Sequence, residues 1–281
     1  MAGSMKVAGA SANEAYRSFQ FGDYATLIPL LVVQWLFLIL GLNMGATWGM
    51  AVAGTIARWI VGDAALDYPG FLQLLPLTFS YVESASFILV GAFALPRLAA
   101  HVMGRTKAPK AQVEAARARV GAAILPTFLA LLGAFLVTYA WQLYASRGLH
   151  ALLAPYIQGW VQSAIATWIV SVAVGYAITT YAIYVPIVAV SESLSPVAAL
   201  TKGVGEGWKR FRTTYPYALL LSLPALLLQL FVQIGGAVLS NRTRPENVAY
   251  LLLAYVVAST VATYFVWSMA TRYYVARTEA A

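Results

Sequence analysis

Long apolar stretches recur along this chain, and they constrain its fold more than any other feature of the sequence. Six of them are long enough to cross about 30 Å of hydrocarbon as an α-helix. They cover residues 25–44, 71–95, 121–144, 160–190, 215–239 and 248–271. Inside a bilayer the backbone amides and carbonyls have to pair within their own segment, so such stretches fold as helices. The sequence therefore predicts an all-α, polytopic membrane helix bundle with six transmembrane helices.

The composition agrees with this class and suggests how the chain is divided. Hydrophobic residues make up 61% of the 281 residues, charged residues only 10%, and the mean hydropathy is +0.73. We expect a polar N-terminal arm (1–23), one membrane domain (24–271) and a short tail (272–281). The net charge of +8 would suit nucleic acid, but the basic residues lie in short connections between spans. They therefore indicate topology and contact with anionic lipid, and no nucleic acid.

The distribution of Lys and Arg predicts the orientation. The two tails and the long connections 97–119 and 202–212 together hold 14 of the 18 Lys and Arg residues, and the other connections hold 4. Cytoplasmic loops carry the excess of positive charge in membrane proteins. We therefore expect a multi-pass membrane protein with both termini and both long basic connections in the cytoplasm.

The connection between the fourth and fifth spans carries the strongest local signals. Pro186 lies near the end of the fourth span, where it removes a backbone donor and bends the helix. Ser195 and Pro196 have the pattern of an N-cap followed by proline in the first helical position. Glu192 lies at the end of the fourth span, and we expect it to act as a latch. It would bond the first amides of the Pro196 helix, or pair with Lys202 or Arg97.

The helix that starts at Pro196 is predicted to be amphipathic. Its apolar residues fall within one narrow arc at helical spacing, with Trp208 near the middle: Leu200, Val204, Trp208, Phe211 and Tyr215. Its basic residues are Lys202, Lys209, Arg210 and Arg212. This pattern is typical of a helix in a membrane interface. Three glycines at positions 203, 205 and 207 weaken the helix, so it needs lipid or a protein neighbour. An ordinary cytoplasmic connector and a docking site for lipid or a partner both remain open.

Glu83 is the acidic residue placed deep inside a span. A charged carboxylate is costly there, so it is expected to be protonated, paired or exposed to a wet cavity. The candidate intramembrane polar site consists of Glu83, Ser80, Tyr81 and Ser84. Partners on other spans would come from five glutamines, at positions 34, 142, 162, 229 and 233. Glu83 is either part of a proton or cation pathway or a neutral acid that is hydrogen-bonded between helices.

Glycines also follow the first span. Gly41, Gly45 and Gly49 have a four-residue spacing that allows close helix packing, although they equally mark the end of that helix. The stretch 47–61 is apolar but short and contains Arg58, so we interpret it as an interfacial helix rather than a span.

No reactive constellation is found in the sequence. The chain has no cysteine, and it contains none of the metalloprotease, nucleophile-elbow, P-loop or dinucleotide-binding motifs. We therefore expect no catalytic residue, no cofactor, no metal and no enzymatic activity.

Two segments resemble a known family. They are VPIVAVSESLSPVAAL (Val185–Leu200), which is followed by a Trp and basic stretch, and ATRYYVAR (Ala270–Arg277). Both are similar to the six-span membrane domain that is fused to some glycerophosphodiester phosphodiesterases, and to its stand-alone YciC-like bacterial relatives. The resemblance implies the six-span architecture and an inner-membrane location. The phosphodiesterase site belongs to a separate soluble barrel that this chain lacks, so no catalytic residue is carried over.

Two functions are consistent with these observations. The first is a non-catalytic scaffold, or an accessory subunit of a larger membrane complex, that grips lipid or a partner through its basic amphipathic connections. The alternative is a transporter or lipid-handling protein with an intramembrane site around Glu83. A water-filled cavity that reaches Glu83 would favour the alternative. A tightly packed bundle with an exposed apolar side face would favour the subunit.

Overall fold

The computed structural model of the chain describes residues 2–42, 50–63, 71–153, 160–238 and 246–278. Within these ranges all regular secondary structure is helical, which confirms the predicted all-α class. Six helices are long and apolar enough to cross a membrane, as the hydropathy pattern predicted. The chain therefore has the architecture of a multi-pass membrane protein.

Six long helices carry the apolar stretches. They are α3 (Ile28–Leu42), α6 (Phe71–Met103), α8 (Val120–Ala140), α10 (Trp160–Ala182), α12 (Pro196–Val238) and α13 (Glu246–Thr278). Shorter helices are α1 (Ala2–Arg17), α2 (Phe21–Tyr24), α5 (Thr55–Val61), α7 (Lys110–Ala118), α9 (Ser146–Leu153) and α11 (Tyr184–Ser191). A 3₁₀ turn, Ala25–Leu27, precedes α3, and π-helical turns occur at Met50–Gly54 and Trp141–Ala145.

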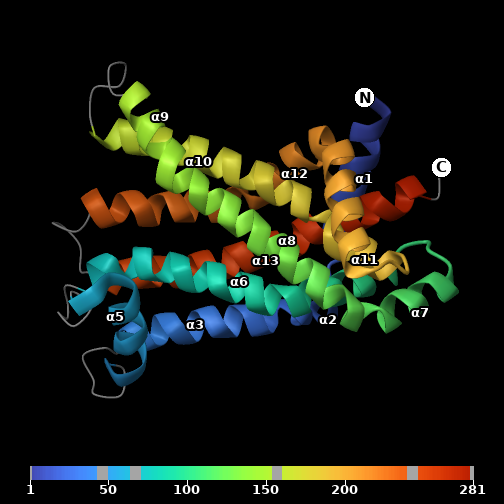
Figure 1. The fold of residues 1–281 in the computed structure, drawn as a ribbon, viewed down its shortest axis with the longest axis horizontal. Helices are drawn as coiled ribbons and strands as arrows, with labels where there is room; N and C mark the ends of the chain where they lie inside the picture. Colours follow the sequence, from blue (N-terminus) through green and yellow to red (C-terminus); the bar gives the residue numbers. More distant parts are fainter. Residues whose placement is uncertain (1, 43–49, 64–70, 154–159, 239–245, 279–281) are drawn as a thin grey trace.

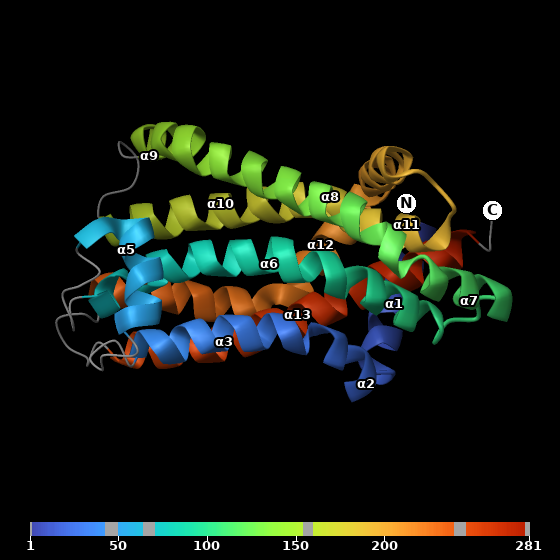
Figure 2. The same ribbon diagram turned by 60° about the horizontal axis from the view of Figure 1, so that its bottom comes forward.

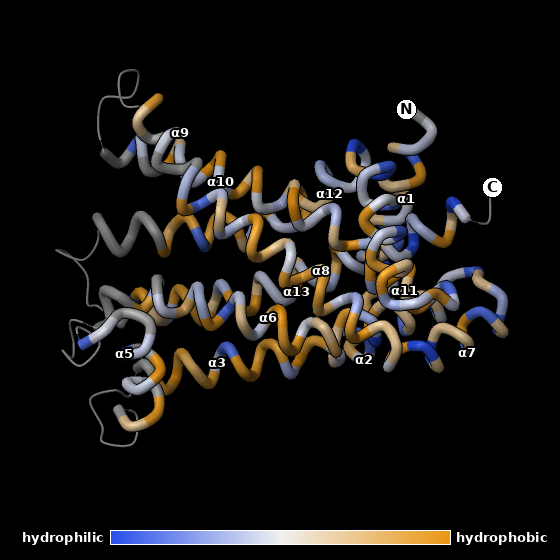
Figure 3. Tube along the Cα trace, in the orientation of Figure 1, coloured by the Kyte–Doolittle hydropathy of each residue, from blue (hydrophilic) through white to orange (hydrophobic). Residues whose placement is uncertain are grey.

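Both termini lie at one end of the bundle, together with α7 and α11 (Figure 1). We call this the terminus end, and the opposite end, with α5 and α9, the far end (Figure 2). Polar residues gather at the terminus end, whereas the helices between the two ends are mainly apolar (Figure 3). Helices α6, α8, α10, α12 and α13 pack in a closed ring, each against the next, and α3 packs outside it on α6 and α13.

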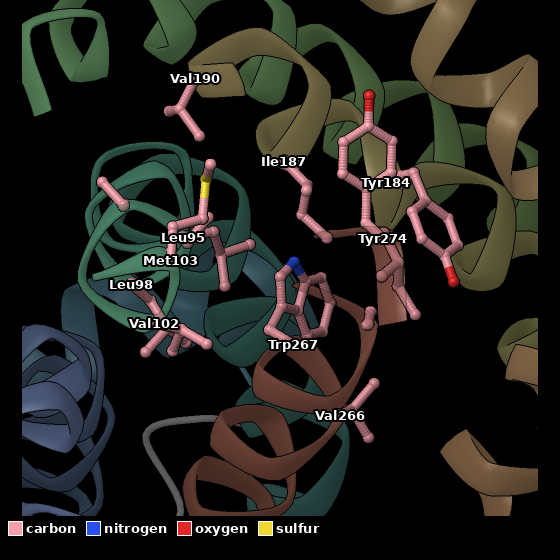
Figure 4. Close-up of a cluster of buried hydrophobic side chains, with 14 of the residues drawn as sticks. Leu95, Leu98, Val102, Met103, Tyr184, Ile187, Val190, Val266, Trp267 and Tyr274 are labelled. Atoms are coloured by element: carbon pink, nitrogen blue, oxygen red, sulfur yellow. The ribbon is translucent and has the colours of Figure 1, made fainter. Parts of the chain in front are cut away.

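The largest hydrophobic core lies at the terminus end and is built around α11 (Figure 4). Every residue of α11 from Tyr184 to Val190 is buried. Leu95 and Leu98 of α6 and Trp267 of α13 belong to the same cluster. A second core joins α3, α6, α12 and α13, and includes Phe79 and Tyr255. The terminus end is thus closed by packed side chains.

The fourth span bends where Pro186 predicts it. Proline has no N–H to donate to the carbonyl four residues earlier, and its ring clashes with that carbonyl. The carbonyl belongs to Ala182, where α10 ends, and α11 starts again at Tyr184. The helix is interrupted at Ile183, and α11 then continues into the core.

The structure corrects the prediction of a separate interfacial helix and fifth span. Both belong to one helix, α12, which begins after Ser195; the Ser195 Oγ accepts a hydrogen bond from the Ala198 amide at 3.3 Å. Pro216 lies inside α12 and does not end it. A helix can pass through a proline by bending, because only one backbone hydrogen bond is lost. The first part of α12 lies across the terminus end, and the remainder then turns to run with the spans (Figures 1 and 2).

The glycines of α12 are contact points. A Cβ atom on Gly203 would lie 2.5 Å from the Cα of Val185, and one on Gly207 would lie 2.6 Å from the carbonyl oxygen of Tyr181. A Cβ atom on Gly205 would meet nothing within 4 Å. The neighbour that this helix was expected to need is therefore the chain itself, at the bend between α10 and α11.

The N-terminal arm is a docked helix. Helix α1 packs on α13 and α12. Arg272 of α13 is only 4% exposed; its Nη2 donates to Ser18 Oγ at 2.6 Å, and its Nη1 lies 3.5 Å from a carboxylate oxygen of Glu14. Arg277 donates to Ser4. Residues 272–278, which were expected to be tail, continue α13.

The predicted packing glycines cannot be placed. Gly45 and Gly49 lie outside the described residues, and the surroundings of Gly41 are not described either. Within the stretch 47–61, residues 50–61 are helical. Arg58 forms an exposed ion pair with Asp63 at 2.8 Å.

The glycine contacts give a first test. We expect Gly203→Ala to lower the thermal unfolding temperature in detergent, because overpacking against backbone costs about 1–3 kcal/mol. Gly205→Ala is the matched control on the same helix. It is expected to leave stability unchanged or raise it by up to about 1 kcal/mol, the helix-propensity difference. Equal effects of the two substitutions, measured by intrinsic fluorescence, would contradict the close approach.

Candidate functional site

A cavity of about 270 Å³ lies inside the ring of helices. Helices α6, α8, α10, α12 and α13 all contribute to its wall, together with Ile183 from the bend. It reaches Glu83, near the middle of the second apolar stretch. A cavity therefore lies at the position where the sequence analysis asks for a water-filled one in a transporter or lipid-handling protein.

The lining of the cavity changes character along its length. Helices α6, α10 and α13 run from the far end to the terminus end, and α8 and α12 run the opposite way. The polar end, nearer the far end, is lined by Glu83, Ser84, Thr138, Tyr176, Ser222, Tyr255 and Ser259. The apolar end, nearer the termini, is lined by Ile88, Leu131, Ile183, Ala218, Val266 and Trp267. One end thus suits a polar group and the other an apolar one.

Glu83 has one side-chain partner among the described residues. The Tyr255 hydroxyl donates to Glu83 Oε1 at 2.7 Å, and the second carboxylate oxygen has no hydrogen-bond partner in the described part of the chain. The described lining includes no Lys, Arg or His. The carboxyl group therefore keeps one free oxygen and lacks a countercharge.

Sequence reasoning missed Tyr255 because it looked for partners of Glu83 on other spans only among the glutamines. The signal available was its position inside the sixth apolar stretch, away from either end. Tyr176 and Ser222, which also line the polar end, were missed as well.

Only part of the predicted polar site is brought together. Ser84 lines the cavity beside Glu83, whereas Ser80 and Tyr81 are exposed on α6 and do not line it. Gln34, a predicted partner of Glu83, donates to Ser86 at 3.0 Å instead. Ser80 lies one turn before Glu83 and Ser84 on α6, nearer the far end than the cavity lining, and Tyr81 lies on another face of the helix.

A cluster of charged and aromatic side chains lies at the terminus end, next to the apolar end of the cavity. Arg210 of α12 pairs with Glu206 at 2.8 Å, and its guanidinium carbon lies 4.7 Å from the ring centre of Tyr274 and 5.3 Å from that of Tyr184. The Tyr184 and Thr214 hydroxyls hydrogen-bond at 2.6 Å. Tyr184 directly follows Ile183 of the cavity wall. The cluster therefore ties α11, α12 and α13 together just beyond the cavity.

Glu192 extends this cluster toward the surface. It forms the ion pair with Lys202 that the sequence suggested, with 2.5 Å between Lys202 Nζ and Glu192 Oε2. Its other oxygen accepts a hydrogen bond from Tyr274 at 2.9 Å. Arg119, at the start of the third span, donates to the Ser191 carbonyl at 2.9 Å. Glu192 thereby joins the start of α12 to α13.

In the first part of α12, the buried and exposed faces also differ from those that the sequence predicts. Arg210 was expected on the solvated basic side, but its side chain is only 15% exposed, because it pairs with Glu206 one turn earlier on the face that meets the bundle. The predicted apolar face is partly open: Trp208 is 72% exposed and stacks on Tyr181 with 5.6 Å between ring centres. Lys209 and Arg212 are exposed beside it.

Comparisons with known proteins identify no family or function for this chain. No protein-family model matches the chain, and no curated protein or solved structure is significantly similar to it. The resemblance to the YciC-like family stays a prediction. Among the described residues, no group of three or more His, Asp or Glu side chains is placed to hold a metal ion.

The Arg210 cluster gives a second prediction. Replacing Arg210 with Met removes the cation from the tyrosine rings and leaves Glu206 with Lys209 as its remaining partner. We expect a loss of about 2–4 kcal/mol, since breaking a buried pair leaves an incompletely compensated charge. The readout is the thermal unfolding temperature in detergent.

The matched control is Lys209→Met, on the same carboxylate. Lys209 is 73% exposed. An exposed ion pair contributes at most about 1 kcal/mol, so only a small change in unfolding temperature is expected. If Lys209→Met lowered the unfolding temperature as much as Arg210→Met, the stacked arginine would not be what holds this end together.

Proposed function

We propose that this protein binds an amphiphilic molecule within the membrane and handles it as a lipid-binding or transport protein. The observation that carries the proposal is the two-part lining of the cavity. Its polar end holds a carboxyl group and several hydroxyls, and its apolar end holds aliphatic side chains and Trp267. Ligand pockets are mostly apolar with a few polar groups that fix the orientation of the ligand.

The shape of the cavity supports an elongated ligand. On α13 the lining runs from Tyr255 to Trp267 along one helix face. These two residues are 12 positions apart, which corresponds to roughly 18 Å at about 1.5 Å per residue. A modest volume spread over that length suits one chain with a head group better than a compact solute. The head group would lie against Glu83 and the chain toward Trp267.

The charge distribution supports an orientation for this site. Residues 97–119 and 202–212, both rich in Lys and Arg, belong to the connections at the terminus end. By the positive-inside rule, this end faces the cytoplasm of a bacterial inner membrane. The polar end of the cavity then faces the outer half of the bilayer, and the Arg210 cluster separates the cavity from the cytoplasm. No catalytic step is part of this proposal.

Filling the cavity tests the proposal. Ala134 of α8 lines the cavity and is half-buried, so Ala134→Phe places a ring in the space. We expect the purified wild-type protein to carry an extractable amphiphile, identified by mass spectrometry, and the variant to lose most of it. Reconstituted in liposomes, the wild type is expected to move a fluorescent lipid between leaflets faster than the variant.

Ala140→Phe is the matched control. Ala140 lies on the same helix, is exposed and does not line the cavity. This variant is expected to retain the bound amphiphile and the wild-type transfer rate. Equal amphiphile content and equal transfer in all three proteins would refute the proposal.

The accessory-subunit function is a second candidate, favoured by the exposed face of α12. Trp208 projects beside Lys209 and Arg212, a combination that suits a partner protein or anionic head groups. If this is the main function, the protein extracted in mild detergent is expected to run as a larger complex, and Trp208→Ala is expected to release it. A lone species that binds amphiphile would instead support the first candidate.

A further inference from the structure

We propose that the head group taken by the cavity is a protonated amine that pairs with Glu83. This inference rests on the proposed function, because it treats the cavity as the site of an amphiphile. It identifies the chemical class of that amphiphile from the charge and the hydrogen-bonding character of the polar end.

Among the described residues, the cavity lining gives Glu83 no countercharge. Glu83 lies inside the ring of helices, and the described lining brings no Lys, Arg or His to it. Tyr255 satisfies one carboxylate oxygen, and the other receives no hydrogen bond from the described residues. An unpaired carboxylate is costly in a low-dielectric surrounding. A ligand that brings its own positive charge removes this cost, whereas an anionic head group would add repulsion.

Several hydroxyl groups of the lining direct their hydrogens into their own helices and not into the cavity. Three hydroxyls of the lining donate their hydrogens to carbonyls one turn back in their own helices: Ser84 to Ser80 at 2.8 Å, Thr179 to Gly175 at 2.9 Å, and Thr263 to Ser259 at 2.9 Å. Each hydroxyl has one hydrogen, so these groups are left with lone pairs. Ser84 thus offers an acceptor beside Glu83 for an ammonium group, and Thr179 and Thr263 offer further acceptors toward the apolar end.

Other head groups fit less well. Phosphate and sulfate esters carry hydrogen-bond acceptors and negative charge. The polar end of the cavity also presents acceptors and a carboxylate, so the two would repel each other. An alcohol supplies one donor but leaves Glu83 without a countercharge. A quaternary ammonium supplies the charge but no N–H donor. A primary ammonium supplies both the positive charge and the N–H donors.

The test is binding of three probes with one chain length to the protein in phosphatidylcholine nanodiscs. The probes are radiolabelled dodecylamine, dodecanol and dodecyl sulfate, measured by equilibrium dialysis against empty nanodiscs. We expect the wild type to bind dodecylamine at least tenfold more tightly than dodecanol, and dodecyl sulfate most weakly. In Glu83→Gln the preference for the amine is expected to disappear while dodecanol binding remains.

Two controls separate the possible results. Glu114→Gln removes an exposed carboxylate on α7, far from the lining, and is expected to keep the wild-type preference. Thermal unfolding of Glu83→Gln close to the wild type shows that the variant is folded, since glutamine still offers Tyr255 an acceptor. An amine preference that persists in folded Glu83→Gln, or is lost in Glu114→Gln, would overturn the inference.

The failure of this inference can be told from that of the proposed function. If the wild type binds all three probes equally and Ala134→Phe abolishes that binding, the cavity holds amphiphiles and only the amine assignment is wrong. If Ala134→Phe changes the binding of no probe, the cavity is not the site, and both proposals fall.

Discussion

The close approach of two backbones at the terminus end is the contact on which the rest of the structure depends. Gly203 and Gly207 bring α12 directly against Tyr181 and Val185, at the bend that Pro186 introduces. This contact fixes where α12 crosses the bundle and where it turns to run with the spans. Because lipid offers little hydrophobic drive for helix association, packing of small residues and hydrogen bonds has to hold such helices together. Gly203 and Gly207 allow the close helix packing that this requires.

Two acidic residues in the bundle differ in how completely their carboxylates are paired by other side chains. Glu206 at the terminus end has Arg210 and Lys209 as partners, and the arginine is further enclosed by tyrosine rings. Glu83 at the polar end of the cavity has only the Tyr255 hydroxyl among the described residues. The first arrangement is complete without a ligand and holds helices in place. The second leaves an oxygen and a charge to be satisfied, which is why we connect it with binding.

Sequence reasoning succeeded where a pattern acts locally. The apolar lengths predict the six spans, the Ser195-Pro196 pair predicts the start of α12, and Pro186 predicts the bend. It failed where the outcome depends on a partner far along the chain. The hydrogen bond between Tyr255 and Glu83 joins residues 172 positions apart. No periodicity of either helix reveals which of its faces meets the other.

The sequence by itself determined the membrane class, the number of spans and the depth of the acidic residue, because hydrocarbon thickness and backbone pairing leave an apolar stretch few alternatives. The tertiary structure alone decided that α12 is continuous, that Arg210 is enclosed by tyrosines, and that Glu83 faces a cavity with an apolar end. These features follow from which helix faces meet. That is set by side-chain packing among several helices at once, and no single stretch of sequence contains it.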